Sequence, residues 1–238
     1  MALLAGELVT QRAEAKTAGF AYLSYIVFTM SSTIIYAKAA AGDGATQQLA
    51  GLARMISQVR ITVLLDLLQV VCALVLAVTL YRLTKIVDPT LALLAMMFRV
   101  GEGLVGSLAI LSKVELMRLA TAKTTDSAIA RIFGDYIFNR PDQLFSEFCF
   151  VVGGFIFAYL FLRGHLIPSL LAWIGVVSIG IQMVCVPLQI AGFMSSSVVD
   201  LLWLAVMAYE IPLGIWLIVK GVKDSNALAL KRELLVDL

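Results

Sequence analysis

The sequence predicts an all-α integral membrane protein, a bundle of about six transmembrane helices accompanied by short interfacial helices. Of its 238 residues, 61% are hydrophobic and 14% are charged, and the mean hydropathy is +0.96. This composition argues against a water-soluble domain. The apolar runs are continuous, whereas the strands of a membrane barrel alternate every second residue, so helices are predicted. The net charge of +2 is too small to suggest a nucleic-acid partner.

Each predicted span supplies about 20 mostly apolar residues, the length that crosses the hydrocarbon core of a bilayer as a helix. Pro89 and Pro168 each follow a short turn and are expected to open a helix, where the missing amide proton costs nothing. The six predicted spans are Thr17 to Tyr36, Ile61 to Leu83, Pro89 to Leu111, Phe145 to Leu162, Ile167 to Ile190 and Val198 to Val219.

The spans form a single predicted transmembrane domain over residues 17–223. Residues 1–16 are predicted to be an amphipathic lead-in helix on the membrane surface, and residues 224–238 a cytoplasmic tail. Apolar residues from Ile129 to Ile137 follow helical spacing, which predicts a second interfacial helix in the long connection between the third and fourth spans. Its simplest role is a lid over helix ends.

Basic residues in the short loops set the expected orientation. Arg82, Lys85 and Arg163 all fall on the side of the two termini if six helices alternate. We therefore expect both termini in the cytoplasm of a multi-pass protein of the inner (plasma) membrane. The longer connections on the opposite side also carry basic residues, so the prediction rests on the short turns.

The sequence does not support a histidine metal site, a cysteine-based site or a nucleotide-cofactor site. A cluster of metal-binding histidines is excluded because His165 is the single histidine. Cys72, Cys149 and Cys185 lie in different predicted spans and read as packing residues. No cofactor fingerprint occurs, since the glycines of GEGLVG fall inside a span, where they permit close helix packing. We therefore expect neither a cofactor nor a dedicated metal site.

Ionisable residues inside the spans cost free energy in lipid and are functional candidates for that reason. As candidate acids or bases in catalysis we single out Asp66, Glu102 and Glu210. Four acids face two bases, so at least two carboxylates must be protonated, hydrated or bound to something. A hard cation such as Mg²⁺ stays a minor alternative, because no acidic pair occurs at close spacing. The full set of candidate ligand-binding residues is Arg60, Asp66, Arg99, Glu102, Glu147 and Glu210.

Four stretches together resemble a family of bacterial membrane proteins described as domain of unknown function 4386. They are KTAGFAYLSYIV, the stretch RITVLLDLLQVVCALVLAVTLYRL from Arg60, FLRGHLIPSLLAWIGVV and the closing YEIPLGIWLIVKGVK. The resemblance runs from about Thr17 to Lys223 and departs from the family in the outer loop before Glu147. It implies a helical membrane protein of prokaryotic type, with no established activity to carry over.

Three functions remain open from the sequence. In the first, an outward-opening cavity holds a lipophilic small molecule that the protein binds, carries or converts, with carboxylates as proton donors or acceptors. In the second, the chain is a structural or accessory subunit of a membrane complex, and its charges hold helices together around a protein partner. The third is a proton-coupled transporter, although neither inverted repeats nor interrupted helices are evident. In every case the lipid bilayer is the surrounding medium.

Overall fold

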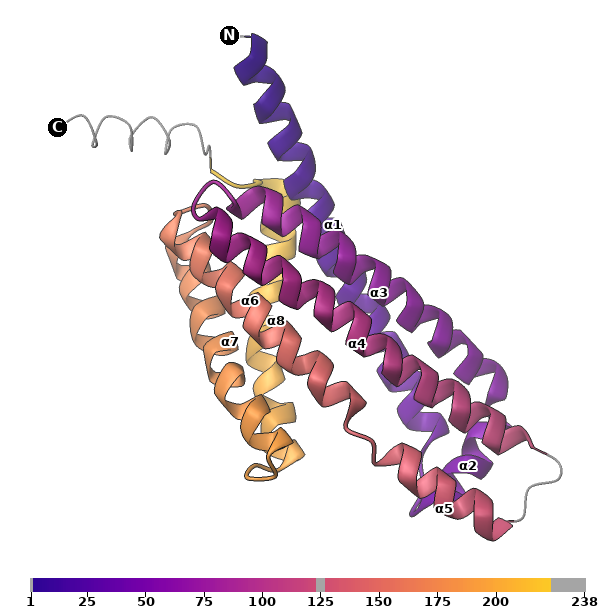
Figure 1. Cartoon of the computed structure of the whole chain (residues 1–238). Coiled ribbons are helices and arrows are strands. Elements are labelled where there is room, and N and C mark those ends of the chain that lie inside the picture. Colours follow the sequence, from indigo (N-terminus) through magenta and orange to yellow (C-terminus); the bar gives the residue numbers. More distant parts are fainter. Residues whose placement is uncertain (1, 123–126, 224–238) are drawn as a thin grey trace.

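The computed structural model describes residues 2–122 and 127–223. Within these residues the chain forms helices and no strands, as predicted, and six helices are long and apolar enough to cross a membrane. The helices, drawn in Figure 1, are α1 (Ala2–Ala39), α2 (Ala45–Arg54), α3 (Ile56–Thr84), α4 (Pro89–Thr121), α5 (Ser127–Phe138), α6 (Asp142–Arg163), α7 (Ser169–Ile190) and α8 (Ser196–Val219).

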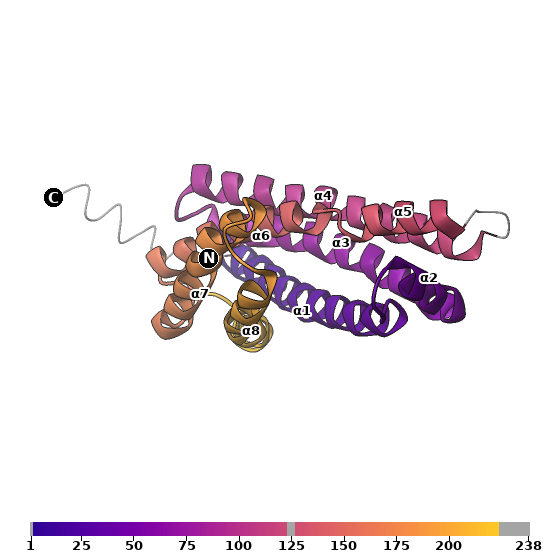
Figure 2. The same ribbon diagram turned by 90° about the horizontal axis from the view of Figure 1, so that it is seen from below.

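The six long helices form a closed ring in the order α1, α3, α4, α6, α7 and α8, and α8 packs against α1 to complete it. The short helices α2 and α5 pack against each other and against α4. Figure 1 places them at the end of the bundle opposite the two chain termini. Seen from below in Figure 2, α2 and α5 lie at one side while α7 and α8 lie at the other. The bundle therefore has two different ends, a termini end and an α2/α5 end.

The turn from α3 to α4 follows the helix-start chemistry that the sequence predicts. Asp88 accepts a hydrogen bond from the backbone N–H of Leu91 at 3.1 Å, and Pro89 takes the first helical position. Arg163, at the end of α6, donates to the other Asp88 oxygen at 3.2 Å. The Leu91 N–H first, and then Arg163, hold the pKa of the Asp88 carboxyl below its usual range. Two neighbouring turns at the termini end are thus joined.

The turn from α6 to α7 contains His165, whose φ of 49° lies in the left-handed region. This conformation closes the end of α6, because the N–H of Leu166 returns to the Phe161 carbonyl at 3.1 Å. The N–H of Lys223 then donates to the Leu166 carbonyl at 2.9 Å, which ties the chain after α8 to this turn. The single histidine is therefore an exposed turn residue at the termini end.

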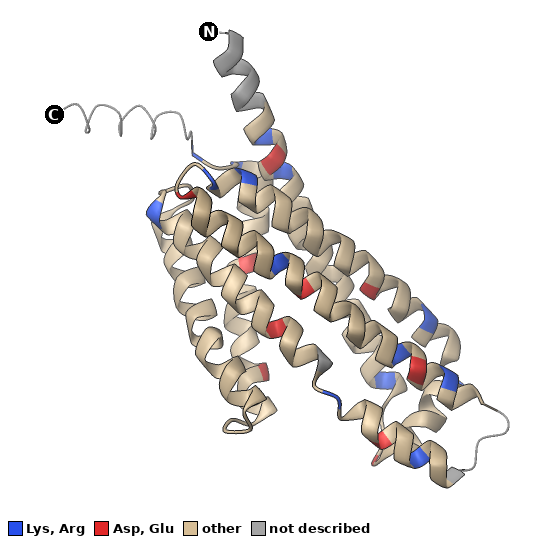
Figure 3. Ribbon diagram, in the orientation of Figure 1, with Lys and Arg blue, Asp and Glu red and all other residues tan. Residues whose placement is uncertain are grey.

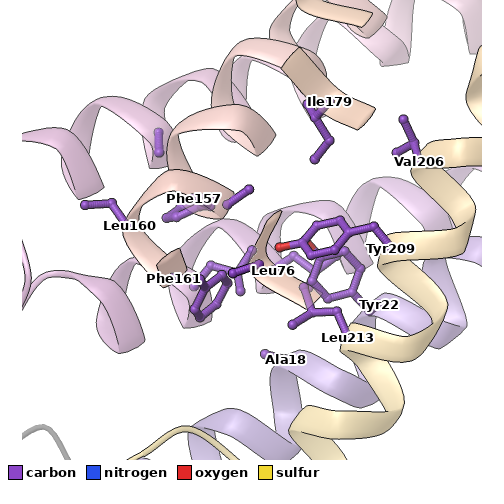
Figure 4. Packing of buried hydrophobic residues seen from close by; sticks show 14 of the residues in the cluster. Ala18, Tyr22, Leu76, Phe157, Leu160, Phe161, Ile179, Val206, Tyr209 and Leu213 are labelled. Atoms are coloured by element: carbon purple, nitrogen blue, oxygen red, sulfur yellow. The ribbon is translucent and has the colours of Figure 1, made fainter. Parts of the chain in front are cut away.

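The termini half of the ring is packed solid with apolar side chains. Figure 4 shows Phe157, Phe161 and Leu213 meeting between the helices, together with buried residues such as Leu76 and Tyr209. Contacts between glycine and its neighbours bring the helix backbones close together. A Cβ on Gly19 of α1 would lie 2.5 Å from the Gly214 carbonyl oxygen of α8, so only glycine permits this approach. Helices α1 and α8 are therefore in close contact in this half of the bundle.

Some elements differ from the sequence expectation. The connection after α1 contains the ten-residue helix α2, which follows a turn with Gly42 and Gly44 at φ 142° and 87°. Helix α1 continues without a break through residue 16, so the expected lead-in and the first span share one helix. Helix α4 runs to Thr121, well past the expected end of its span. The predicted helix around residues 129–137 is present as α5, while the tail at 224–238 lies outside the described residues.

Candidate functional site

A cavity of about 740 Å³ lies inside the ring, bounded by α1, α3, α4, α6 and α8 and reaching the C-terminal end of α5. Each helix contributes residues at helical spacing, so that one face of it looks inward. Helix α8 provides Asp200, Trp203, Met207 and Glu210. Glu210 follows Asp200 by ten residues, which corresponds to a rise of about 15 Å along the helix. The cavity thus extends from the middle of the ring towards the α2/α5 end.

The first charged cluster lies at the inner end of the cavity, around Glu102 of α4. Arg99 and Glu102 are one helical turn apart, with 2.8 Å between Nη1 and Oε2, and both side chains are almost fully buried. The Tyr25 hydroxyl of α1 donates to Glu102 Oε1 at 2.7 Å. The Arg99 guanidinium lies 4.6 Å from the centre of the Phe150 ring, and its nitrogens make no hydrogen bond of good geometry. A buried ion pair with aromatic neighbours closes the floor of the cavity.

The second cluster joins α1, α3 and α4 on the cavity wall. Lys113 Nζ lies 2.5 Å from Asp66 Oδ2, and the Ser32 hydroxyl donates to the other Asp66 oxygen at 2.5 Å. The ammonium of Lys113 also lies 4.6 Å from the centre of the Tyr36 ring. Both charged side chains keep about a seventh of their surface exposed, at 15% and 14%, so this pair can contact water or a ligand in the cavity.

Two further span carboxylates face the cavity with no basic partner among the residues that the structure describes. Glu210 of α8 is 5% exposed and makes neither a hydrogen bond nor a salt bridge there. Glu147 of α6 accepts a hydrogen bond from Gln143, one turn earlier on the same helix. The field of Asp200, at the start of α8, reaches Glu147 across the mouth of the cavity. Acidic groups therefore outnumber basic ones along this surface.

The structure brings together most of the residues that the sequence singled out. Asp66, Glu102, Glu147 and Glu210 line the cavity, and Arg99 lies directly behind Glu102. Arg60 differs, because it lies exposed on α3 and is not part of the cavity wall.

Sequence reasoning missed Lys113, Tyr25 and Ser32. Lys113 follows Glu102 by 11 residues, three helical turns, so a search for polar residues on one face of α4 finds it. It falls beyond the predicted end of the third span at Leu111, and this hid it. The two hydroxyls, on Tyr25 and Ser32, carry no comparable signal, because such side chains are common on apolar helices.

The cavity offers acid–base and ion-binding chemistry on an apolar background. Carboxylates held in such surroundings can take up or release protons near neutral pH. Figure 3 shows charged positions in the middle of the bundle as well as at its ends. Among the described residues, no three His, Cys, Asp or Glu side chains come close enough to hold a metal ion. The exposed His165 lies at the other end of the molecule from this surface.

Comparison with known proteins adds the family. No curated protein and no solved structure matches the chain. One family model matches residues 17–221, which include α1 from residue 17 onwards, the other five long helices and both charged clusters. The chain therefore belongs to the family described as domain of unknown function DUF4386.

Proposed function

We propose that this protein binds an amphipathic small molecule in the cavity, with its apolar part along the helix walls and its polar part at Glu102 and Glu210. The observation that carries the proposal is the combination of a ligand-sized cavity, mainly apolar walls and convergent charged groups at one end. Cavities of about 300–1,000 Å³ with a few placed polar groups are typical of small-molecule sites. A purely structural set of charges would not require open space beside it.

The apolar packing of the termini half supports an entrance to the binding site from the α2/α5 end. Phe161 and Leu213 belong to the buried apolar core and do not line the cavity. With both termini in the cytoplasm, as the short basic turns predict, the cavity opens outward. In a carrier or an enzyme, Asp66, Glu102 and Glu210 would then exchange protons with the bound molecule. Their neutral variants Asp66→Asn and Glu210→Gln test this step once a turnover assay exists.

Native mass spectrometry of the protein extracted gently from its own membrane tests the proposal directly. We expect a stoichiometric small molecule on the wild-type chain. Ala109→Trp places a large ring on the cavity wall, whereas Leu108→Trp places the same ring on the exposed face of α4, where Leu108 is 45% exposed. The proposal expects the first variant to lose the bound molecule and the second to keep it.

Two results would contradict the proposal. One is a wild-type chain that carries no small molecule in its native membrane extract. The other is equal retention by the Ala109→Trp and Leu108→Trp variants, which would place the molecule outside the cavity. A stoichiometric protein partner on a chain with an empty cavity would instead favour an accessory subunit. In that case the exposed apolar face of α5, which includes Ile132 and Tyr136, is the first surface to mutate.

A further inference from the structure

We infer that the bound molecule is an organic cation, a lipophilic amine or quaternary ammonium compound. This inference rests on the proposed function and specifies the chemistry of its ligand. The charges on the cavity wall are mainly negative. The carboxylates that line the cavity are Asp66, Glu102, Glu147, Asp200 and Glu210, and the basic side chains are Lys113 and Arg140.

The basic groups near the cavity are already engaged. Lys113 is paired with Asp66, and Arg99 is paired with Glu102. Arg140 forms a salt bridge with Glu115, with 3.6 Å between Nη1 and Oε2, and Glu115 does not line the cavity. The remaining carboxylates, Glu147, Asp200 and Glu210, form no salt bridge with the described residues, although the field of Arg99 reaches Glu210. An anionic ligand would meet net repulsion here, and a cation would meet attraction.

Glu210 is the residue that points most directly to a ligand. Its side chain is 95% buried, as its exposed fraction of 5% implies, and it faces the cavity without a hydrogen bond or a salt bridge to the described residues. A buried carboxylate without a hydrogen bond or a salt bridge is costly, because its charge has lost water, and the more distant charge of Arg99, which is already paired with Glu102, compensates only part of that loss. A cationic group in the cavity beside it supplies the missing partner.

The walls next to these carboxylates are rich in aromatic rings. Tyr25, Phe150 and Trp203 line the cavity, and the rings of Phe150 and Trp203 meet edge to face at 5.3 Å. The Arg99 guanidinium already lies over Phe150 and Tyr25, so of these three rings Trp203 is the one left to a ligand cation. Aromatic faces combined with carboxylates are well suited to ammonium and quaternary ammonium groups. A divalent metal fits less well, since no three ligating side chains converge among the described residues. The surface therefore favours an organic cation.

The experiment measures binding of two defined cations to the full chain in nanodiscs of phosphatidylcholine. The probes are radiolabelled tetraphenylphosphonium, which is rigid, and dodecyltrimethylammonium, which is flexible. Glu210→Gln and Glu147→Gln each remove one cavity carboxylate, and Asp43→Asn removes an exposed carboxylate in the turn before α2 as a matched control. Ala109→Trp blocks the cavity. Monodisperse gel filtration and an unchanged melting midpoint show which variants are folded.

We expect saturable binding of at least one cation to the wild type and to Asp43→Asn. Affinity should fall by about tenfold or more in each Gln variant, the effect of removing one member of a close charge pair. Saturable binding that Ala109→Trp abolishes but neither Gln variant weakens would overturn the cation proposal and leave the cavity as a binding site. The cation proposal would also be overturned if neither cation showed saturable binding. If native mass spectrometry then found a neutral or anionic molecule on the wild-type chain, the proposed function would still stand.

Discussion

The buried pair of Arg99 and Glu102 allows a quantitative test of the site. Glu102→Gln keeps the size of the side chain and removes its charge, which leaves the Arg99 guanidinium in the interior without its closest anion. Arg99 is 1% exposed and lies 2.8 Å from the Glu102 carboxylate. Phe150, Tyr25 and the neighbouring Glu210 remain in the variant, but none of these lies in salt-bridge contact with Arg99.

The expected effect follows from two opposing free energies. At 2.8 Å and an effective dielectric constant of 20, the attraction within the pair is about 6 kcal/mol. Removing the two ions from water costs several kcal/mol each, so the pair as a whole adds little net stability. Removing only one partner leaves the cost of the other uncompensated, and we expect Glu102→Gln to lower the free energy of unfolding by about 3–5 kcal/mol.

Unfolding in mixed micelles with a rising fraction of sodium dodecyl sulfate, followed by tryptophan fluorescence, measures this loss. The double variant Arg99→Met and Glu102→Gln is the decisive control, because it removes both charges and restores an uncharged interior. We expect it to be more stable than Glu102→Gln alone. A loss below about 1 kcal/mol in the single variant, or a double variant no more stable than the single one, would refute a buried charged pair.

Three further predictions concern the cavity entrance, a turn and the closed end. In a cysteine-free background, a membrane-impermeant thiol reagent added to intact cells should label Ala109→Cys but not Leu108→Cys. If Ala109→Cys were labelled only after permeabilisation, the cavity would open to the cytoplasm and the predicted orientation would be wrong. The pKa of Asp88 is lowered in the fold, so its stabilisation is present above pH of about 4 and is lost as the pH falls through the folded-state pKa. Asp88→Ala should lower the melting midpoint at neutral pH and flatten its decline in acid, and a parallel decline in both proteins would contradict this. Gly19→Ala should cost about 1–3 kcal/mol in the same unfolding assay by forcing α1 away from the Gly214 carbonyl, so an unchanged midpoint would show that the helices are not in contact.

The membrane spans were predictable from sequence because a bilayer imposes one strong condition, about 20 consecutive apolar residues for each helix. The start of α4 was predictable for a local reason, since proline after an acidic residue begins helices. Helix α2 was harder to predict. It is short, and its residues are stabilised by packing of Leu49 and Leu52 in the small core beneath α5, a contact between segments far apart in sequence.

For the candidate site, the sequence identified the charged residues that cost free energy in lipid, but it did not identify their partners. The charges of Asp66, Glu102 and Glu210 stand out in apolar segments because charge in lipid is costly. Which basic side chain pairs with which carboxylate depends on how the helices are rotated and ordered around the ring. A single sequence does not show that arrangement. Lys113, for example, comes from α4 and pairs with Asp66 of α3. Arg60 stood out for the same reason as the others, yet the rotation of α3 leaves it on the exposed surface.

Small residues bring α1 and α8 close together in the termini half of the bundle, away from the cavity. At Gly19 and Gly214 the two helices meet almost backbone to backbone, so apolar side chains from the other helices fill the ring there. Towards the α2/α5 end, Tyr25 of α1 and Met207 of α8 line the cavity. Open space and unpaired carboxylates therefore occur in the same half of the molecule. Charges can persist inside such a membrane bundle where water or a ligand can reach them, and Glu210 meets this condition because it lines the cavity.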